Sequence, residues 1–242
     1  MRLDKLLAML GEGTRTQVRD AIRAGRVTVN GAAVRDAGMQ VDAETAQVCI
    51  GGRALSYKRV RHVMLHKPGG VLTAARDKKQ KTVMDLLPPM YAAMGCMPAG
   101  RLDKDTEGLL IITSDGQLAH RIISPKKEVG KVYLAHVDGP LARQDADAFA
   151  AGLHISDSDG EIDAAPARLE ILSASPSLSV ARVRVTEGKY HQVKRMFAAR
   201  GVQVVYLKRL QIGALALDET LAPGEWRELS GEEVALLEQE VE

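Results

Sequence analysis

The chain has 242 residues, of which 45% are hydrophobic and 26% are charged. These values are typical of a globular protein with one large domain, or with one small and one medium domain. It has only two cysteines, Cys49 and Cys96, which argues against a disulfide scaffold and against a zinc site. We find no basic-then-apolar leader and no run of ~18 apolar residues, so we expect a cytoplasmic protein that does not enter a membrane.

The net charge of +2 is unevenly distributed along the chain. Residues 215–242 contain nine acids and one arginine, a net −8, so residues 1–214 carry +10. A basic body with an acidic tail suits a polyanionic partner. An unevenly charged soluble surface would give the same pattern, so charge leaves both interpretations open.

The first part of the chain predicts two short helices followed by a β-hairpin. Helical spacing of leucines marks the first helix: Leu3, Leu6, Leu7 and Leu10. Thr14 and Gln17 form a capping-box signature for the second helix, and Gly25 ends it. Residues 27–29 and 32–34 flank the turn dipeptide Asn30-Gly31, which predicts a hairpin.

The second predicted helix carries a row of arginines on one face, interrupted only by Asp20: Arg15, Arg19, Arg23 and Arg26. Such a row can be a solvated face, but its lack of neutralising acids favours phosphate binding. With the segments 2–6 and 25–31, residues 1–48 resemble an RNA-binding module of a small-subunit ribosomal protein, tyrosyl-tRNA synthetases and RNA-modifying enzymes. The resemblance implies RNA contacts by exposed bases, which we assign to Arg2, Lys5, Arg15, Arg19, Arg23 and Arg26.

The remainder predicts an α+β domain. Gly51-Gly52 and the basic run 58–61 indicate a linker, which gives an RNA-binding domain at 1–50, a linker at 51–61 and a second domain at 62–242. Apolar runs predict strands at 63–65, 109–112, 132–137, 178–186 and 202–207, and helical patterns fall at 117–124, 144–151, 190–200 and 231–240. We expect a mixed, mostly antiparallel central sheet flanked by helices. No Gly-rich nucleotide fingerprint occurs.

Residues 100–110 are the densest polar segment that leads directly into a strand. Asp103 lies between Arg101 and Lys104, neighbours that keep a carboxylate ionised, as a nucleophile requires. Asp105 and Gly108 are better explained as turn formers. Spacing alone leaves a purely structural role for Asp103 open.

Two further segments could contribute to a site. In the basic segment 187–197, Lys189, Lys194 and Arg195 could bind phosphates or pair with a carboxylate, since bases near a helix N-terminus are unfavourable without an anion. In segment 131–133, Tyr133 could also be an ordinary strand residue. We interpret His191 as a packing residue, and we set aside metal binding by His62 and His66 because no acidic third ligand is near.

Together these segments resemble the RsuA family of pseudouridine synthases. The motifs are Gly-Arg-Leu-Asp-x-Asp-Thr-x-Gly-Leu at 100–109, Lys-x-Tyr-Leu at 131–134, Glu-Gly-Lys-Tyr-His-Gln-Val-Lys-Arg-Met-Phe at 187–197, and Leu-x-Arg-x-x-Ile-Gly at 207–213, leading to Leu-x-Pro-Gly-Glu-Trp-Arg at 221–227. The wording of the third motif is most similar to the small-subunit enzyme.

The resemblance implies a role for each matching residue. It makes Asp103 the catalytic aspartate, Lys194 the base that pairs with it, and Tyr133 the ring that stacks on the target base and a candidate for the proton step at carbon 5. Arg101 would enter the space left by the flipped nucleotide, Ile212 would lie near the uracil pocket, and Lys189 and Arg195 would contact the substrate. Many relatives have arginine where this chain has Lys194, so a bidentate pair is not available here.

We therefore expect conversion of a uridine in 16S ribosomal RNA to pseudouridine by base flipping, with no cofactor. The expected partner is ribosomal RNA, in a small-subunit assembly intermediate, and the expected state is a monomer. The same reaction on a 23S uridine remains an alternative. So do a non-catalytic RNA-binding assembly factor and, on the two-carboxylate pattern, a glycoside hydrolase using Asp103 with Asp105 or Glu107.

Overall fold

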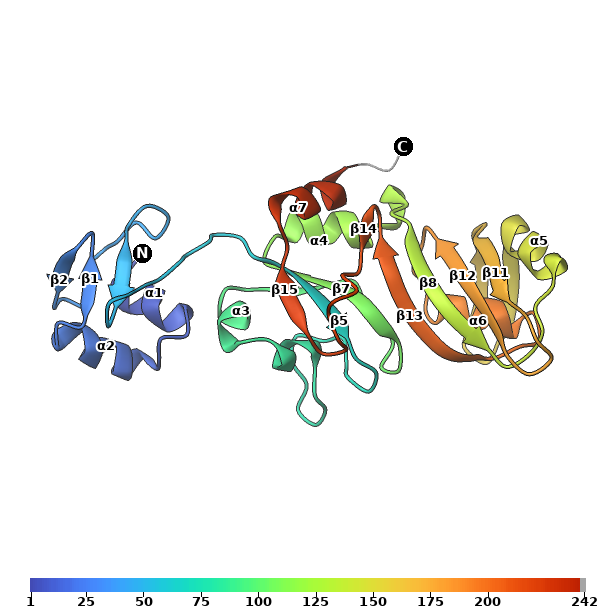
Figure 1. The fold of residues 1–242 in the computed structure, drawn as a ribbon, viewed down its shortest axis with the longest axis horizontal. Helices are drawn as coiled ribbons and strands as arrows, with labels where there is room; N and C mark the ends of the chain where they lie inside the picture. The colour runs from blue at the N-terminus through green and yellow to red at the C-terminus, as the bar shows by residue number, and fades with distance from the viewer. Residues whose placement is uncertain (240–242) are drawn as a thin grey trace. The chain divides into compact units, whose positions relative to one another are not determined.

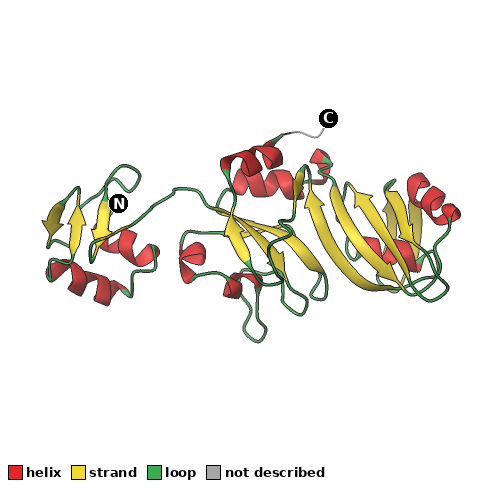
Figure 2. Ribbon diagram, viewed as in Figure 1, coloured by secondary structure: helices red, strands yellow, loops and turns green. Residues whose placement is uncertain are grey.

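A computed structural model describes residues 1–239, and the chain divides into two compact units. The first comprises Met1–Arg61 with Leu87–Cys96, and the second comprises His62–Leu86 with residue 97 onward. Figure 1 traces the elements in chain order, and Figure 2 separates helices from strands by colour. None of the helices described here is long and apolar enough to cross a membrane.

The first unit packs two helices on a small antiparallel sheet. The helices are α1 (Leu3–Met9) and α2 (Arg15–Arg23), and the strand order is β2 (Ala32–Val34), β1 (Val27–Val29), β3 (Val48–Ile50), β4 (Arg53–Ala54). The predicted leucine stripe is the core, because Leu3, Leu6 and Leu7 are all at most 1% exposed. The Thr14–Gln17 capping box forms as predicted, with both reciprocal hydrogen bonds present.

The boundary predicted for this unit is wrong by several residues. Gly51-Gly52 is the turn of the β3–β4 hairpin, and both glycines have positive φ. The Leu55 N–H donates to the carbonyl of Val48, so the sheet extends past residue 50. The predicted linker at 51–61 therefore begins inside the first domain. A Gly-Gly pair occurs both in two-residue hairpin turns and in linkers, so the sequence alone does not distinguish the two.

The second unit is built on one large sheet. Its order is β11 (Arg168–Ser173), β12 (Ser179–Val185), β8 (Lys131–Val137), β13 (Val204–Ile212), β7 (Glu107–Thr113), β5 (His62–Lys67), β15 (Trp226–Glu228), with β14 (Leu215–Ala216) on β13 and β6 (Met97–Ala99) on β7. Among the described strands of this sheet, β13 and β7 pair in parallel and the other neighbours are antiparallel. The predicted mixed, mostly antiparallel sheet is confirmed.

Helices cover two separate apolar cores of this sheet. One core includes α5 (Arg143–Ala151) and α6 (Gln192–Ala198). The ring centroids of Phe149 on α5 and Phe197 on α6 are 5.1 Å apart. The other includes α4 (Gly116–Ile123) and α7 (Gly231–Glu238), which contact each other (Figure 1). All four predicted helices are present; the predicted end of the last, at Glu240, falls outside the described residues. The sequence patterns missed four strands of the large sheet, β6, β11, β14 and β15. They also missed shorter elements: α3 (Pro89–Ala93), the 3-10 turns η1 (Val83–Leu86) and η2 (Pro125–Lys127), and the hairpin β9 (Leu153–Asp157)–β10 (Gly160–Ala164).

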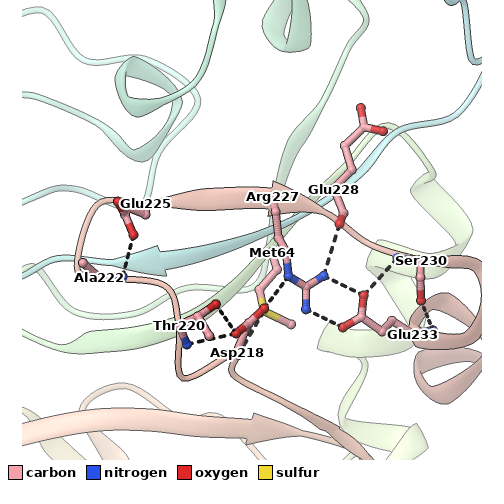
Figure 3. Close-up of polar contacts among 9 residues, drawn as sticks. All are labelled: Met64, Asp218, Thr220, Ala222, Glu225, Arg227, Glu228, Ser230 and Glu233. Carbon is pink, nitrogen blue, oxygen red and sulfur yellow. Dashed lines mark hydrogen bonds and ion pairs between the residues drawn. The ribbon is translucent and has the colours of Figure 1, made fainter.

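The acidic C-terminal segment is held by one arginine (Figure 3). The Arg227 guanidinium donates to Asp218 at 2.6 Å and makes two hydrogen bonds of 2.7 Å to Glu233. Hydrogen bonds from Thr220 and Arg227 lower the pKa of Asp218 to about 2. Glu233 also closes a capping box of α7 with Ser230. Part of the acidic tail is therefore internal structure joining β15 to α7 rather than free surface charge.

Candidate active site

Asp103 lies on the loop between β6 and β7, and a buried lysine shapes this loop. The Lys67 side chain is 0% exposed, and its Nζ donates to the carbonyls of Pro68, Lys104 and Thr106 at 3.1, 3.1 and 2.8 Å. Burial lowers the pKa of Lys67 to about 8, although the nearby carboxylates of Asp105, Asp103 and Glu107 oppose this. The ammonium group thus fixes the backbone on the C-terminal side of Asp103.

Thr73 fixes the backbone on the other side. Its hydroxyl donates to the Leu102 carbonyl at 2.8 Å and accepts from the Leu102 N–H at 3.2 Å. Asp103 therefore lies between two anchored residues, and its side chain is 30% exposed in a cleft. A catalytic group gains from such support because its geometry is set before the substrate arrives.

A lysine from a distant helix reaches this carboxylate. Lys194 of α6 places its Nζ 3.1 Å from Asp103 Oδ2 and 2.6 Å from Asp105 Oδ1. Burial acts to lower the pKa of Lys194, but hydrogen bonds to Asp105 and Asp103 outweigh it and the pKa is raised. The pKa of Asp105 is lowered, because Lys194 outweighs the opposing effect of burial. Asp105, interpreted from the sequence as a turn former, therefore also shares the charge of Lys194.

His191 lies on the other side of Asp103. Its Nε2 is 3.6 Å from Asp103 Oδ1, and its Nδ1 is 3.7 Å from Asp159 Oδ2 in the β9–β10 turn. The residue has a φ of +50° and caps α6, so the backbone turns sharply where the ring enters the cleft. The sequence interpretation assigned His191 to packing. Its αL conformation, which directs the ring toward Asp103, has no signature in the sequence.

Tyr133 of β8 completes the cleft. It lines the same space as Asp103, Lys194 and Leu207, and Arg209 Nη1 lies 3.5 Å from its hydroxyl oxygen. Arg209 is itself buried on β13, where its Nε donates to the Leu109 carbonyl at 2.7 Å. The three residues assigned to catalysis by the family resemblance thus come together from the β6–β7 loop, β8 and α6.

Of the other residues predicted to contact the substrate, some line this cleft and others do not. Arg101 and Lys189 line the cleft, and Lys189 Nζ is 3.0 Å from Glu187. Arg195 is 5% exposed, does not line the cleft and pairs with Asp157 at 2.8 Å. Of the two roles that the sequence allowed for Arg195, carboxylate pairing is the one observed.

Ile212 also lies away from this cleft. It is fully buried in the α4–α7 core, with its neighbours Leu215 and Leu109. The apolar residue of β13 that lines the cleft is Leu207, at the start of the same motif. Leu207 pairs with Ala135 of β8 and Ile212 pairs with Lys131, so the two side chains share one face of the sheet and differ in their place along β13.

No group of three or more metal-ligating side chains occurs in residues 1–239. His62 Nδ1 is bonded to the Thr113 hydroxyl at 2.9 Å, and His66 Nδ1 lies 2.7 Å from the Leu221 carbonyl oxygen. Both imidazoles are thereby engaged in the sheet and its flanking loop.

The first unit presents a separate basic surface. All of its predicted RNA-binding bases are exposed: Arg2, Lys5, Arg15, Arg19, Arg23 and Arg26. Asp4 is buried, and its carboxylate accepts from Arg2 at 2.9 and 3.0 Å and from Arg19 at 2.9 Å. Hydrogen bonds from Arg2 and Arg19 hold the pKa of Asp4 well below its usual range, against the effect of burial. One buried acid therefore orients two exposed guanidinium groups.

An anchored carboxylate, a paired lysine and a tyrosine beside an apolar wall can act on a flat base, and a separate basic surface can hold a polyanion. This combination is that of an enzyme that modifies RNA. Residues 61–199 match the RNA pseudouridylate synthase family, and residues 1–46 match the S4 domain. The chain belongs to the RNA pseudouridylate synthase family.

Similar proteins match nearly the whole chain. An uncharacterized RNA pseudouridine synthase of Bacillus subtilis is 46% identical over 98% of both chains. The ribosomal small subunit pseudouridine synthase A of Escherichia coli is 40% identical over 97% of this chain and 99% of its own. A crystal structure of a pseudouridylate synthase matches with a TM-score of 0.67 and 36% identity, covering 98% of this chain and 99% of that one.

Proposed function

We propose that this pseudouridine synthase modifies a uridine of small-subunit (16S) ribosomal RNA, with Asp103 as the catalytic carboxylate. The convergence of Asp103, Tyr133 and Lys194 in one cleft carries the catalytic assignment. The RNA assignment is supported by the 40% identity to enzymes named ribosomal small subunit pseudouridine synthase A. The S4 domain supports a structured RNA as the substrate.

The reaction is an isomerisation. The bond between ribose carbon 1 and uracil nitrogen 1 breaks, the base turns, and carbon 5 bonds to the same ribose carbon. Carbon 5 then loses its proton and nitrogen 1 gains one, so no atom or electron is exchanged with a second reactant. Every step requires the uridine outside its helix stack, at a cost of a few kcal/mol.

Each cleft residue has a defined task in this proposal. Asp103 attacks the ribose carbon or removes a ribose proton, and Lys194, 3.1 Å away, is the cation that pairs with its carboxylate. Tyr133 stacks on the uracil, with Leu207 as the apolar wall of the same space. Stacking of this kind contributes about 1–3 kcal/mol per base, enough to offset much of the flipping cost. Arg101, exposed beside Asp103, occupies the place vacated by the flipped nucleotide.

The first unit holds the RNA through its exposed basic surface around Asp4. We propose a partly assembled small subunit as the physiological substrate and a monomer as the active form. Comparison of naked 16S RNA with reconstituted particles, at enzyme concentrations spanning the assay range, tests both points. Faster modification of naked RNA, or a rate that rises with the square of enzyme concentration, would contradict them.

Mapping pseudouridines at nucleotide resolution in ribosomal RNA tests the proposal directly. We expect deletion of the gene to remove one pseudouridine from 16S RNA. The intact gene should restore it, whereas a copy carrying Asp103→Asn should not. A site missing from 23S RNA instead would overturn the RNA assignment, and restoration by Asp103→Asn would overturn the catalytic assignment.

A further inference from the structure

A second cavity opens beside the cleft that holds Asp103. Its volume is about 510 Å³, and it shares Asp103, Arg101 and His191 with the cleft. Residues that line only this second cavity are Leu72, Thr73, Ala74, Lys104 and Tyr190. The space is therefore continuous with the catalytic residues, yet none of the steps described above uses it.

Tyr190 is the conspicuous side chain of this second cavity. The residue is 61% exposed. One face stacks on the His191 ring, with ring centroids 3.8 Å apart and planes at 25°. His191 in turn lies within 4 Å of both Asp103 and Asp159. The exposed ring of Tyr190 thus stacks on His191, which itself lies between the carboxylates of Asp103 and Asp159.

The surroundings carry the charge that a nucleotide needs. Arg101 is exposed and makes no hydrogen bond or ion pair within the described part of the chain. Lys104 donates to Gln80 at 2.7 Å, which joins the Asp103 loop to an exposed loop that follows Ala74. That loop bears four exposed bases and one acid: Arg76, Asp77, Lys78, Lys79 and Lys81. A flat exposed ring beside clustered cations matches the way that proteins bind unstacked bases and their phosphates.

We propose that this cavity binds the nucleotide next to the target uridine, with its base stacked on Tyr190 and its phosphates facing Arg101 and the loop at 76–81. The inference rests on the proposed function only in taking a flipped uridine to occupy the cleft. Flipping one nucleotide also unstacks its neighbour, because adjacent bases share a face. Tyr190 gives the neighbouring base a new stacking partner and so lowers the cost of opening the RNA.

Binding of two single-stranded RNAs to the full chain tests this site without knowledge of the natural target. One probe is oligouridylate; the other has the same length and charge but an abasic residue in place of every second uridine. We expect the wild type to bind oligouridylate about tenfold more tightly than the alternating probe. Tyr190→Phe should keep this preference. Tyr190→Ala should bind both probes with the weaker affinity, while Leu178→Ala, another exposed side chain, should behave as the wild type.

The salt dependence separates stacking from a general loss of structure. Stacking releases few counterions, so Tyr190→Ala should keep the wild-type slope of log Kd against log salt, whereas Arg101→Gln should reduce it by about one. Equal affinity of the wild type for both probes, or a preference retained by Tyr190→Ala, would overturn the subsite. A Tyr190-dependent preference in a protein that leaves 16S RNA unmodified would uphold the subsite and reject the 16S assignment.

Discussion

The two units of this chain build their functional surfaces in opposite ways. In the first unit, the predicted contact residues all fall within residues 2–26 and are exposed, and two of them, Arg2 and Arg19, pair with the buried Asp4. In the second unit, Asp103, Tyr133 and Lys194 are about 30 to 90 positions apart in the sequence and meet only through the sheet. Local order is enough to display charge for a polyanion, whereas a reacting base requires groups fixed from several directions. Substitutions in the first unit should therefore weaken RNA binding without stopping the reaction, and substitutions in the second unit should do the opposite.

The largest effect expected is that of Asp103→Asn on turnover. The amide cannot attack the ribose or accept its proton, so the rate of pseudouridine formation should fall by at least about 10³-fold. RNA affinity should change little, because the basic surface of the first unit is untouched. Single-turnover tritium release from 5-tritiated uridine measures the rate, and filter binding measures affinity. A loss of RNA affinity as large as the loss of rate would show that catalysis and RNA binding do not depend on separate surfaces.

Next in size is the loss of stability expected for Gly108→Ala. Gly108 has a φ of +105°, and a Cβ there would lie 2.2 Å from the carbonyl oxygen of Arg209 on the paired strand β13. Backbone atoms cannot yield at that distance, so we expect a cost of about 4 kcal/mol or more. Gly116→Ala, with open space around the position, is the matched control. Equal urea midpoints for the two variants would show that β7 and β13 can move apart to accept the added Cβ without loss of stability.

Lys67→Met should damage the second unit alone. The substitution leaves three carbonyls without the donor that Lys67 supplies, and the bond to Thr106 is a buried one, for which we expect a cost of about 1–3 kcal/mol before relaxation. The Asp103 loop loses its anchor, and we expect kcat to fall on the order of 10²-fold. Wild-type kcat in a destabilised variant would show that Thr73 and the strand ends suffice to hold Asp103.

A smaller effect is expected from neutralising the first unit. The triple variant Arg15→Gln, Arg23→Gln, Arg26→Gln removes exposed bases that do not pair with Asp4. We expect about tenfold weaker RNA binding, and a slope of log Kd against log salt reduced by about one for each phosphate that the variant no longer binds. Turnover at saturating RNA should remain. Arg143→Gln, at an exposed base of the second unit, controls for the loss of one positive charge, where the triple variant loses three. An equal effect per charge removed would remove the special role of the first unit.

The smallest effect is a pH dependence of stability centred on Lys67. Its folded-state pKa of about 8 lies below the ordinary value of 10.5, so between these pH values the unfolded chain binds more protons than the folded one. The free energy of unfolding contributed by Lys67 should therefore rise as pH increases through this window. Lys131 has a similar pKa but is present in both proteins. Urea midpoints of the wild type and Lys67→Met at pH 7 to 10 should diverge; parallel curves would exclude a lowered pKa for Lys67 in the folded protein.

Elements formed by interactions between residues close in sequence were predicted well, and elements that depend on distant residues were not. The capping box at Thr14 and the four helices of the second domain were predicted correctly, because the residues that determine them lie within a few positions of one another. The β3–β4 hairpin was interpreted as a linker, because pairing partners decide whether a Gly-Gly pair is a turn. Leu207 lines the cleft and Ile212 does not, although both lie on the same face of β13, because the position of a residue along a strand relative to the cleft depends on how the strand is placed in the sheet.

The sequence by itself determined the order of the two domains, the arginine face and the motifs that identify a pseudouridine synthase, since each is carried by consecutive residues. Only the tertiary structure decided that Lys67 and Thr73 fix the Asp103 loop, that His191 lies between two carboxylates and that Arg195 belongs to Asp157. These contacts join residues that lie far apart in the chain. Their energies depend on burial and on distances of about 3 Å, which no local pattern encodes.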